Sequence, residues 1–290
     1  MANLLRLGMT FSPGLAPERV RAVARAVEAG GLDDLWVSED CFKESAVATV
    51  VTALASTERI RVGAAILPVP LRNVAQAAME IATIDRLFPD RFVAGIGHGN
   101  QPWMAQAGVK AEAPLTLLRE YASALRKLLD GESVTTEGRY VRLEEVALDY
   151  PPLRPPQLLI GVAGAKSLEA AGELGTGTLL PLGLDVQGIK ESTQRTLKAA
   201  TDGHEVVASV IVATGPDARA RVDAELAQYG MPANPQIGVV GNAEEIATNL
   251  RQIQATGVTT VAVLPCRDEK DLDQFARFLG QEVRPLLTSK

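Results

Sequence analysis

Short apolar runs rich in β-branched residues alternate along the chain with longer amphipathic stretches. This alternation is typical of parallel strands covered by helices. The run 206–213 is apolar along almost its whole length, as is usual for a parallel strand buried on both faces. Eight such runs are present, the number that closes a barrel, so the pattern predicts an α/β fold, a (β/α)8 TIM barrel. The predicted strands are residues 4–11, 34–38, 60–67, 91–97, 158–162, 177–182, 206–213 and 258–265.

Amphipathic stretches between the first four strands predict helices. Pro17 followed by Glu18 suits a first helical turn. Gly30-Gly31 suits a C-terminal cap in which the backbone becomes left-handed. The predicted helices cover about residues 17–29, 44–55 and 73–87.

Two stretches do not fit the alternation, and we interpret them as insertions in the barrel. Residues 99–114 form a long connection after the fourth strand. Residues 131–156, before the fifth strand, predict a hairpin (134–136 and 140–143) with a turn at Glu137-Gly138, followed by a proline-rich segment. Loops of this length tend to be lids or binding loops, although a surface excursion fits the sequence equally well.

Composition narrows the class of protein. The 290 residues, 47% of them hydrophobic, can bury one large core, so we expect a single domain over 1–290. A net charge of -6 disfavours nucleic acid as a partner. No secretion signal and no run long enough to span a bilayer is seen, which predicts a cytoplasmic protein with no membrane partner. Cys41 and Cys266 stand far apart without neighbouring histidines, so we expect reduced thiols and no metal site.

In a barrel of this kind the active site lies at the C-terminal ends of the strands. The position of each histidine relative to its strand therefore decides which one is the better active-site candidate. His98 follows the fourth strand and is a candidate for ligand contact or acid–base work. His204 precedes the seventh strand, where a surface or structural role is expected. The glycines in Gly95-x-Gly97-x-Gly99 permit close approach of a planar ligand, or simply a tight barrel turn. No helix is expected to start at once, because Gln101-Pro102-Trp103 follows.

After the fifth strand, a glycine-containing turn runs directly into an amphipathic helix over residues 161–172. Free N–H groups and the positive end of the helix dipole suit a phosphate there, and Lys166 could add charge. A helix cap without a ligand is the alternative.

The second strand ends in Glu39-Asp40, a pair that suits polar ring atoms, a substrate or, least well, a metal. Asp40 could instead cap the following helix. The third strand ends in small and then apolar residues, which suit either a flat ring or core packing. The sequence contains no serine-elbow, P-loop or zincin motif. This favours an enzyme in which a bound cofactor carries out the chemistry.

Five segments occur in a characteristic order: residues 63–68 with Arg72-Asn73, 82–87, 91–97, 161–172 and 239–246. Together they resemble the bacterial luciferase-like family of flavin-dependent and coenzyme F420-dependent oxidoreductases, and the resemblance covers almost the whole chain. Two departures concern the cofactor: Gly175-Thr176-Gly177 replaces the family's commoner Ala-Asp-Gly, and Cys41 stands near a position that is often aromatic or His in F420 members.

The resemblance implies a TIM barrel that binds coenzyme F420, or alternatively FMN, at the strand tops. It also implies a bulge with a non-prolyl cis peptide near Ala65-Ile66 behind the ring, and a phosphate site at the turns after strands five and six. The implied catalytic residues are His98, Glu39 and Asp40, with Trp103 and Cys41 at the substrate. The implied cofactor-binding residues are Ala65, Ile66, Asn100, Gly161, Val162, Ala163, Gly164, Ala165 and Leu180.

The leading hypothesis is therefore F420-dependent hydride transfer to or from a small organic substrate. The second is an FMN-dependent monooxygenase supplied with reduced flavin by a partner reductase. A non-catalytic flavin-binding relative and a barrel that holds a sugar phosphate without flavin are further alternatives. Family members are commonly dimers, so a homodimer is expected.

Overall fold

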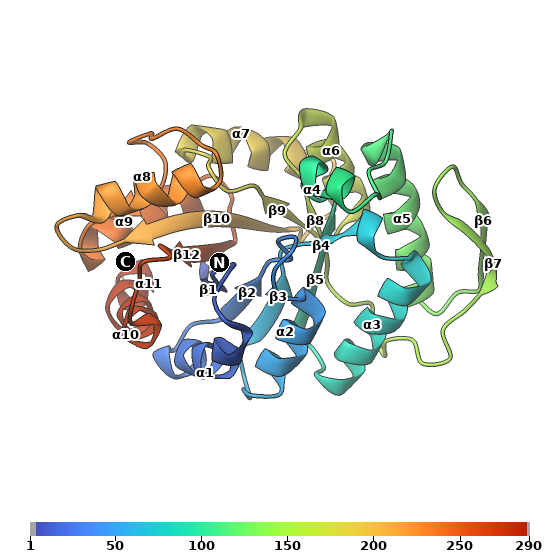
Figure 1. The fold of residues 1–290 in the computed structure, drawn as a ribbon, viewed down its shortest axis with the longest axis horizontal. Coiled ribbons are helices and arrows are strands. Elements are labelled where there is room, and N and C mark those ends of the chain that lie inside the picture. The colour runs from blue at the N-terminus through green and yellow to red at the C-terminus, as the bar shows by residue number, and fades with distance from the viewer. Residues whose placement is uncertain (1–3, 289–290) are drawn as a thin grey trace.

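Eight parallel strand positions close into a barrel, which confirms the predicted fold (Figure 1). The structure, a computed structural model, describes residues 4–288. The barrel closes through parallel pairing of β1 with β12 and of β9 with β10. The strands in barrel order are β1 (Arg6–Phe11), β2 (Asp34–Val37), β3 (Arg61–Ala64) continued by β4 (Leu67–Pro68), β5 (Phe92–Gly97), β8 (Leu158–Gly161), β9 (Gly177–Leu180), β10 (Glu205–Ala213) and β12 (Thr260–Pro265). A short β11 (Val239–Val240) pairs with β10 at its end.

Helices surround the barrel, and the three predicted ones are present (Figure 1). The first is divided between a 3-10 turn, η1, and α1, which Gly31 ends in a left-handed conformation, as expected. Helices α2 and α3 begin after Ser45 and Asn73, whose side chains accept hydrogen bonds from the first turn. The elements are η1 (Pro17–Arg19), α1 (Val20–Gly30), α2 (Ala46–Leu54), η2 (Val69–Leu71), α3 (Val74–Leu87), α4 (Gln101–Gln106), α5 (Pro114–Leu129), α6 (Ala165–Leu174), α7 (Val186–Leu197), α8 (Ala218–Gln228), α9 (Ala243–Gln254), α10 (Leu272–Arg277), η3 (Phe278–Val283) and α11 (Arg284–Thr288).

The structure revises two predicted connections. The segment 99–114 is not a plain loop, because α4 starts directly after Asn100. The expectation that no helix starts there was wrong: Asn100 accepts a hydrogen bond from the Trp103 N–H, and Pro102 suits a first turn. The predicted hairpin is present as β6 (Val134–Glu137) and β7 (Arg142–Val146), but its turn lies slightly further along the chain.

The third predicted strand is interrupted between β3 and β4. The peptide bond between Ala65 and Ile66 is cis, as the resemblance implies. The Ala65 N–H donates to the Val37 carbonyl oxygen on β2, whereas Leu67 is paired with Ile96 on β5. A bulge at Ala65-Ile66 therefore separates the part of the strand that bonds to β2 from the part that pairs with β5.

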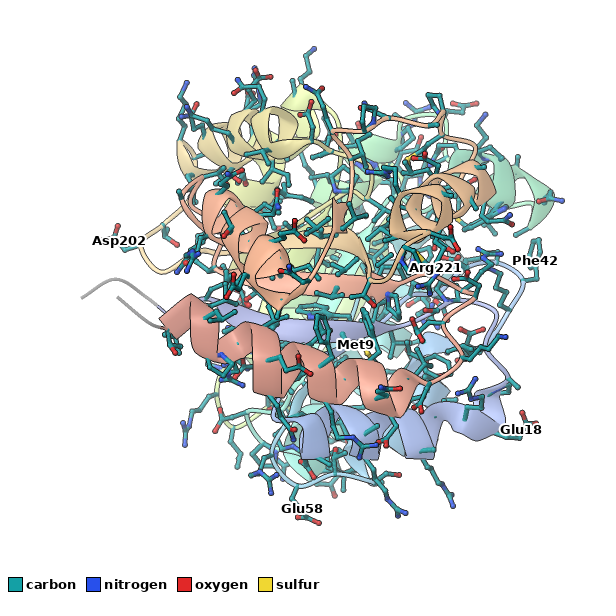
Figure 2. All side chains as sticks on the ribbon, turned by 90° about the vertical axis from the view of Figure 1, so that its left-hand side faces the viewer. Met9, Glu18, Phe42, Glu58, Asp202 and Arg221 are labelled. Atoms are coloured by element: carbon teal, nitrogen blue, oxygen red, sulfur yellow. The ribbon has the colours of Figure 1, made fainter. Side chains whose placement is uncertain are left out.

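Side chains alternate along β1 between the barrel interior and the surrounding helices. Met9, labelled in Figure 2, belongs to the large hydrophobic cluster shared with the helices, whereas a Cβ on Gly8 would meet the indole nitrogen of Trp36. A Cβ on Gly63 would overlap the ring of Trp36. Glycine on both neighbouring strands thus leaves room for a tryptophan that fills the interior.

The loops before and after the strands lie at opposite ends of the molecule. In Figure 2, Asp202, which precedes β10, and Phe42, which follows β2, are at opposite sides. The N-terminal end of the barrel is closed by ion pairs: Arg61 on β3 binds Asp34 on β2 at 2.7 Å and Glu205 on β10 at 2.9 Å. Glu205 also accepts a hydrogen bond from Thr260 on β12.

We expect the substitution Arg61→Met to lower the free energy of unfolding by about 3–5 kcal/mol, because two largely buried carboxylates lose a shared partner. Urea denaturation measures the loss. The control is Arg195→Met, which removes an ion pair in which both side chains are about half exposed and should cost about 0–1 kcal/mol. Equal losses in the two variants would show that the barrel does not depend on Arg61.

Candidate functional site

A cavity of about 610 Å³ opens at the C-terminal ends of the barrel strands. This volume lies within the range of small-molecule and cofactor sites, and the location is the one expected for a TIM barrel. Most residues that the sequence marked as a site do converge there. Those that line the cavity are Glu39, Asp40, Ala65, Ile66, His98, Asn100, Trp103, Gly161, Val162, Ala163, Gly164 and Leu180.

Three side chains lining the cavity carry buried polar atoms with no hydrogen-bond partner among residues 4–288. They are Trp36 Nε1, Ser38 Oγ and His98 Nε2. Buried polar groups in proteins are nearly always paired, because leaving one unpaired costs about 1–3 kcal/mol. Trp36 Nε1 lies beside Gly8 inside the barrel, whereas Ser38 and His98 follow β2 and β5 at the C-terminal strand ends, where a polar ligand could pair with them.

His98 follows β5 and lies at the cavity. Burial lowers the pKa of its imidazole, so the ring is neutral at pH 7. Gly99 lines the same cavity with a φ of +69°. The two preceding glycines serve packing instead, because a Cβ on Gly95 would overlap the Ala64 carbonyl and one on Gly97 would overlap the Gly161 carbonyl. Of the two interpretations of this glycine segment, tight barrel packing is therefore the observed one for Gly95 and Gly97.

The Ala65–Ile66 bulge forms one wall of the cavity. A Cβ on Gly161 would overlap the Ile66 side chain, and one on Gly97 would lie 2.7 Å from Ile66 Cδ1. Glycines on β5 and β8 therefore let Ile66 lie against both strands. This arrangement presents a small, apolar wall at the ends of β3 and β4.

Glu39 has partners within the protein. Its carboxylate forms an ion pair with Arg72, with Arg72 Nη2 at 2.7 Å, and it accepts a hydrogen bond from the Ala46 N–H at the start of α2. Arg72 also binds Glu80 on α3 at 3.2 Å. The carboxylate thus joins the ends of three elements while it borders the cavity.

Asp40 lines the cavity with fewer partners than Glu39. Lys43 binds its carboxylate at 3.3 Å. The alternative that Asp40 caps α2 is not observed, because Ser45 has that role. Cys41, expected at the substrate, is not among the residues that line the cavity. Burial, followed by the negative charges of Glu39 and Asp40, raises the pKa of its thiol.

The turn after β8 leads into α6 with Gly164 as the N-cap residue. Among residues 4–288, no side chain accepts a hydrogen bond from the first turn, so these N–H groups are available to a ligand. Ser167 lines the cavity, whereas Ala165 starts the helix and is not in the lining. Lys166 is exposed and is likewise outside the lining.

Several lining residues were not predicted as site residues. Ser38 directly precedes Glu39, and Ser209 is the polar residue in an apolar strand, so both carried a readable signal. Tyr229 follows α8 in a connection whose course the sequence does not show. Leu264, near the end of β12, has the character of any core residue.

His204 has the expected structural position near the N-terminal end of β10. The side chain is buried, and its Nε2 lies 2.9 Å from Thr178 Oγ1, which lies 2.7 Å from Thr196 Oγ1. Within residues 4–288, no three His, Cys, Asp or Glu side chains gather as metal ligands would. No helix in that range is long and apolar enough to cross a membrane.

Comparison with known families matches residues 5–262 to the luciferase-like monooxygenases. The chain belongs to this family. Among curated relatives, the 5,10-methylenetetrahydromethanopterin reductase of Methanolobus tindarius is 27% identical over 206 residues, which cover 70% of this chain and 63% of the relative. The F420-dependent glucose-6-phosphate dehydrogenase of Kineococcus radiotolerans is 28% identical over 214 residues, 69% of this chain and 63% of that protein. The chain therefore matches less than two thirds of the length of these relatives.

Solved structures show the same architecture for this luciferase-like chain. The coenzyme F420-dependent tetrahydromethanopterin reductase of Methanopyrus kandleri superposes with a TM-score of 0.84 at 18% identity. The alignment covers 97% of this chain and 99% of that one. At this identity the similarity confirms the fold.

The cavity fits the planar, phosphate-bearing cofactors that the resemblance implies. The bulge at Ala65–Ile66 offers an apolar wall to a ring, and the unpartnered Nε2 of His98 could bond to its polar edge. The uncapped start of α6 could bind a phosphate. Each part of such a molecule has a matching group in one cavity.

We expect His98 to make the luciferase-like barrel sensitive to acid. Because the pKa of His98 is lowered on folding, its stabilising contribution is complete above the unfolded value of about 6.5 and is lost as pH falls. The change in unfolding free energy between pH 7.5 and pH 5.5 should therefore be smaller in His98→Gln than in the parent. Urea denaturation at both pH values tests this.

The other histidine, His204, gives a second test. His204→Gln also removes a residue whose pKa burial lowers, so the double variant should lose still more of the pH dependence. An undiminished pH dependence in His98→Gln would contradict the neutral, buried state of His98.

We expect Glu39→Gln to destabilise the protein by about 1–3 kcal/mol, because the charge that binds Arg72 and Ala46 is removed from a nearly buried position. Asp40→Asn is the matched control, with an expected loss of about 0–1 kcal/mol, since Lys43 is its partner near solvent. Urea denaturation compares them. A larger loss in Asp40→Asn than in Glu39→Gln would show that Asp40, and not Glu39, contributes more to stability.

Proposed function

We propose that this chain is a flavin-type oxidoreductase that uses coenzyme F420 for hydride transfer to or from a small organic substrate. The observation that carries the proposal is the cavity itself, in which unpartnered polar atoms, an apolar bulge and an uncapped helix start occur together. The F420 dependence named for relatives supports the choice of cofactor.

Residues of one side of the barrel would hold the cofactor. Ala65 and Ile66 would support one face of the ring, and Asn100 would border it. The turn Gly161–Ala165, together with Leu180 at the end of β9, would surround the phosphate. When bound, the cofactor supplies the site that accepts or donates hydride.

The chain's own side chains would manage protons and orientation. His98, neutral at pH 7 and unpartnered at Nε2, would accept or return the substrate proton. Asp40, with Glu39 fixed by Arg72, would border the polar edge of the ring. Trp103, on α4, would form a wall of the substrate pocket.

A second candidate is an FMN-dependent monooxygenase supplied with reduced flavin by a partner reductase. The family's own description as luciferase-like monooxygenases favours it. We also propose a cytoplasmic homodimer. The family resemblance supports the dimer, and two unpaired cysteine thiols suit a reducing compartment.

Titration of the purified protein with F420, FMN and NADPH, followed by quenching of Trp36 and Trp103, decides between the cofactors. We expect Gly164→Asp to weaken binding of the phosphate-bearing cofactor at least about tenfold, because a carboxylate would occupy the start of α6. The fold should persist, since a Cβ there meets only Ser167 Oγ at 3.9 Å and Asp suits an N-cap position.

Gly164→Ala is the matched control and should retain affinity within about threefold, because it adds the Cβ without the charge. Riboflavin, which has no phosphate, should bind both variants equally if FMN is the ligand. Failure of both F420 and FMN to bind the parent protein would refute the proposed function. Equal affinity in the two variants would refute the phosphate site.

A further inference from the structure

A second cavity, of about 320 Å³, lies at the N-terminal ends of the strands, where Arg61 begins β3 and Phe92 begins β5. Its volume is at the lower end of the range for small-molecule sites. One wall is the turn from α3 to β5, residues 85–92, and the other is the proline-rich segment 153–157 that leads into β8. Among the described residues, none lines both cavities, so the two are separate.

The wall formed by the proline-rich segment is fixed to the barrel by two arginines. Arg86 Nη1 donates to the Pro151 carbonyl at 3.1 Å, and its guanidinium lies 5.7 Å from the centre of the Tyr150 ring. Arg61 Nη1 donates to the side-chain oxygen of Gln157 at 2.9 Å. The prolines restrict the backbone of this segment further. The two walls are therefore held in position before any ligand arrives.

Asp85 brings an unpaired negative charge to this cavity. In the part of the chain that the structure describes, its half-buried carboxylate forms no hydrogen bond and no ion pair. Burial, followed by the negative charge of Asp90, raises the pKa of Asp85, while Arg154 lowers it. Asp85 also lies in the last turn of α3, where the helix dipole is negative. A positively charged group would be stabilised beside it.

Arg86 brings a positive charge that no carboxylate balances within residues 4–288. Its partners are the uncharged Pro151 carbonyl and Tyr150 ring. Gln157 adds hydrogen-bond donors, because its oxygen is occupied by Arg61 whereas its amide N–H groups have no partner in the same range. A carboxylate would be stabilised beside these two side chains.

The other charged residues of the lining are already balanced. Arg154 and Asp90 lie 3.9 Å apart, and both side chains are largely exposed. Arg61 is neutralised by Asp34 and Glu205. The remaining walls are apolar, and hydrocarbon packed against them would be removed from water. They consist of Pro89, Phe92, Leu153, Pro155 and Pro156.

We infer that this second cavity binds a small zwitterion with an apolar body, the chemistry of a free α-amino acid with a hydrocarbon side chain. Its ammonium group would pair with Asp85, and its carboxylate with Arg86 and the Gln157 amide. The hydrocarbon would pack against Phe92 and the prolines. A ligand with a charge of one sign would satisfy one of the two unpaired groups and face the other with its like charge. Because the cavity is separate, the inference does not depend on the cofactor.

Three probes that share one carbon skeleton test the inference on the purified full chain. They are L-leucine, 3-methylbutylamine, which lacks the carboxylate, and 4-methylpentanoate, which lacks the ammonium group. Dissociation constants come from ligand-observed NMR titrations. Leucine should bind at least about tenfold more tightly than either singly charged probe, because it forms both charge-assisted contacts. Absence of leucine binding up to its solubility, or equally tight binding of either other probe, overturns the inference.

Two variants separate the two charged contacts. Asp85→Asn should weaken leucine and 3-methylbutylamine at least about fivefold without weakening 4-methylpentanoate. Arg86→Gln should weaken leucine and 4-methylpentanoate by a similar factor without weakening the amine, and its amide can still donate to the Pro151 carbonyl. The matched control is Asp202→Asn, an exposed aspartate outside the lining before β10 (Figure 2), which should alter none of the three affinities.

Urea denaturation shows whether each variant is folded, and competition shows where leucine binds. Unchanged leucine affinity in folded Asp85→Asn would place leucine elsewhere and overturn the inference. In the parent, saturating F420 or FMN should leave leucine affinity within about twofold, because the two cavities share no lining residue. Displacement of leucine by either cofactor would place it in the catalytic cavity and also overturn the inference. If neither cofactor binds the parent, the proposed function fails and the leucine site is judged by the variants.

Discussion

Arg61 connects carboxylates on strands that are not neighbours in the barrel. Its guanidinium binds Asp34 on β2 and Glu205 on β10, and both acids are largely buried. Buried charges of this kind must satisfy one another, because each alone would cost several kcal/mol. The N-terminal end of the barrel is therefore closed by fixed charges, and Trp36 fills the interior above it. The cavity is left at the C-terminal ends of the strands.

Side chains of the same chemical type differ in this structure by the hydrogen bonds and ion pairs that they form. Glu39 is held by Arg72 and by the start of α2, whereas Asp40 has one ion-pair partner near solvent. Nε2 of His98 is unpartnered at the cavity, whereas Nε2 of His204 is hydrogen-bonded with Thr178 at the opposite end of the barrel. Groups that the protein has already paired stabilise it, and unpaired ones are available for a ligand. This difference is the physical basis for the proposed roles.

The closed barrel places groups of different chemical character around one cavity. Four consecutive strands provide a bulge, a histidine and a helix start, while the other four provide hydroxyl groups and apolar side chains.

The sequence by itself determined the strand positions, the barrel and the end at which the cavity lies. These follow from local periodicity and from the rule that strand ends of a parallel barrel meet on one face. The helix at Asn100 was missed although its capping signal is local. Only the tertiary structure paired Glu39 with Arg72, 33 residues away, filled the space beside Gly95 and Gly97, and brought Tyr229 to the cavity. Such contacts depend on how distant segments pack, and a pattern along one chain does not contain that information.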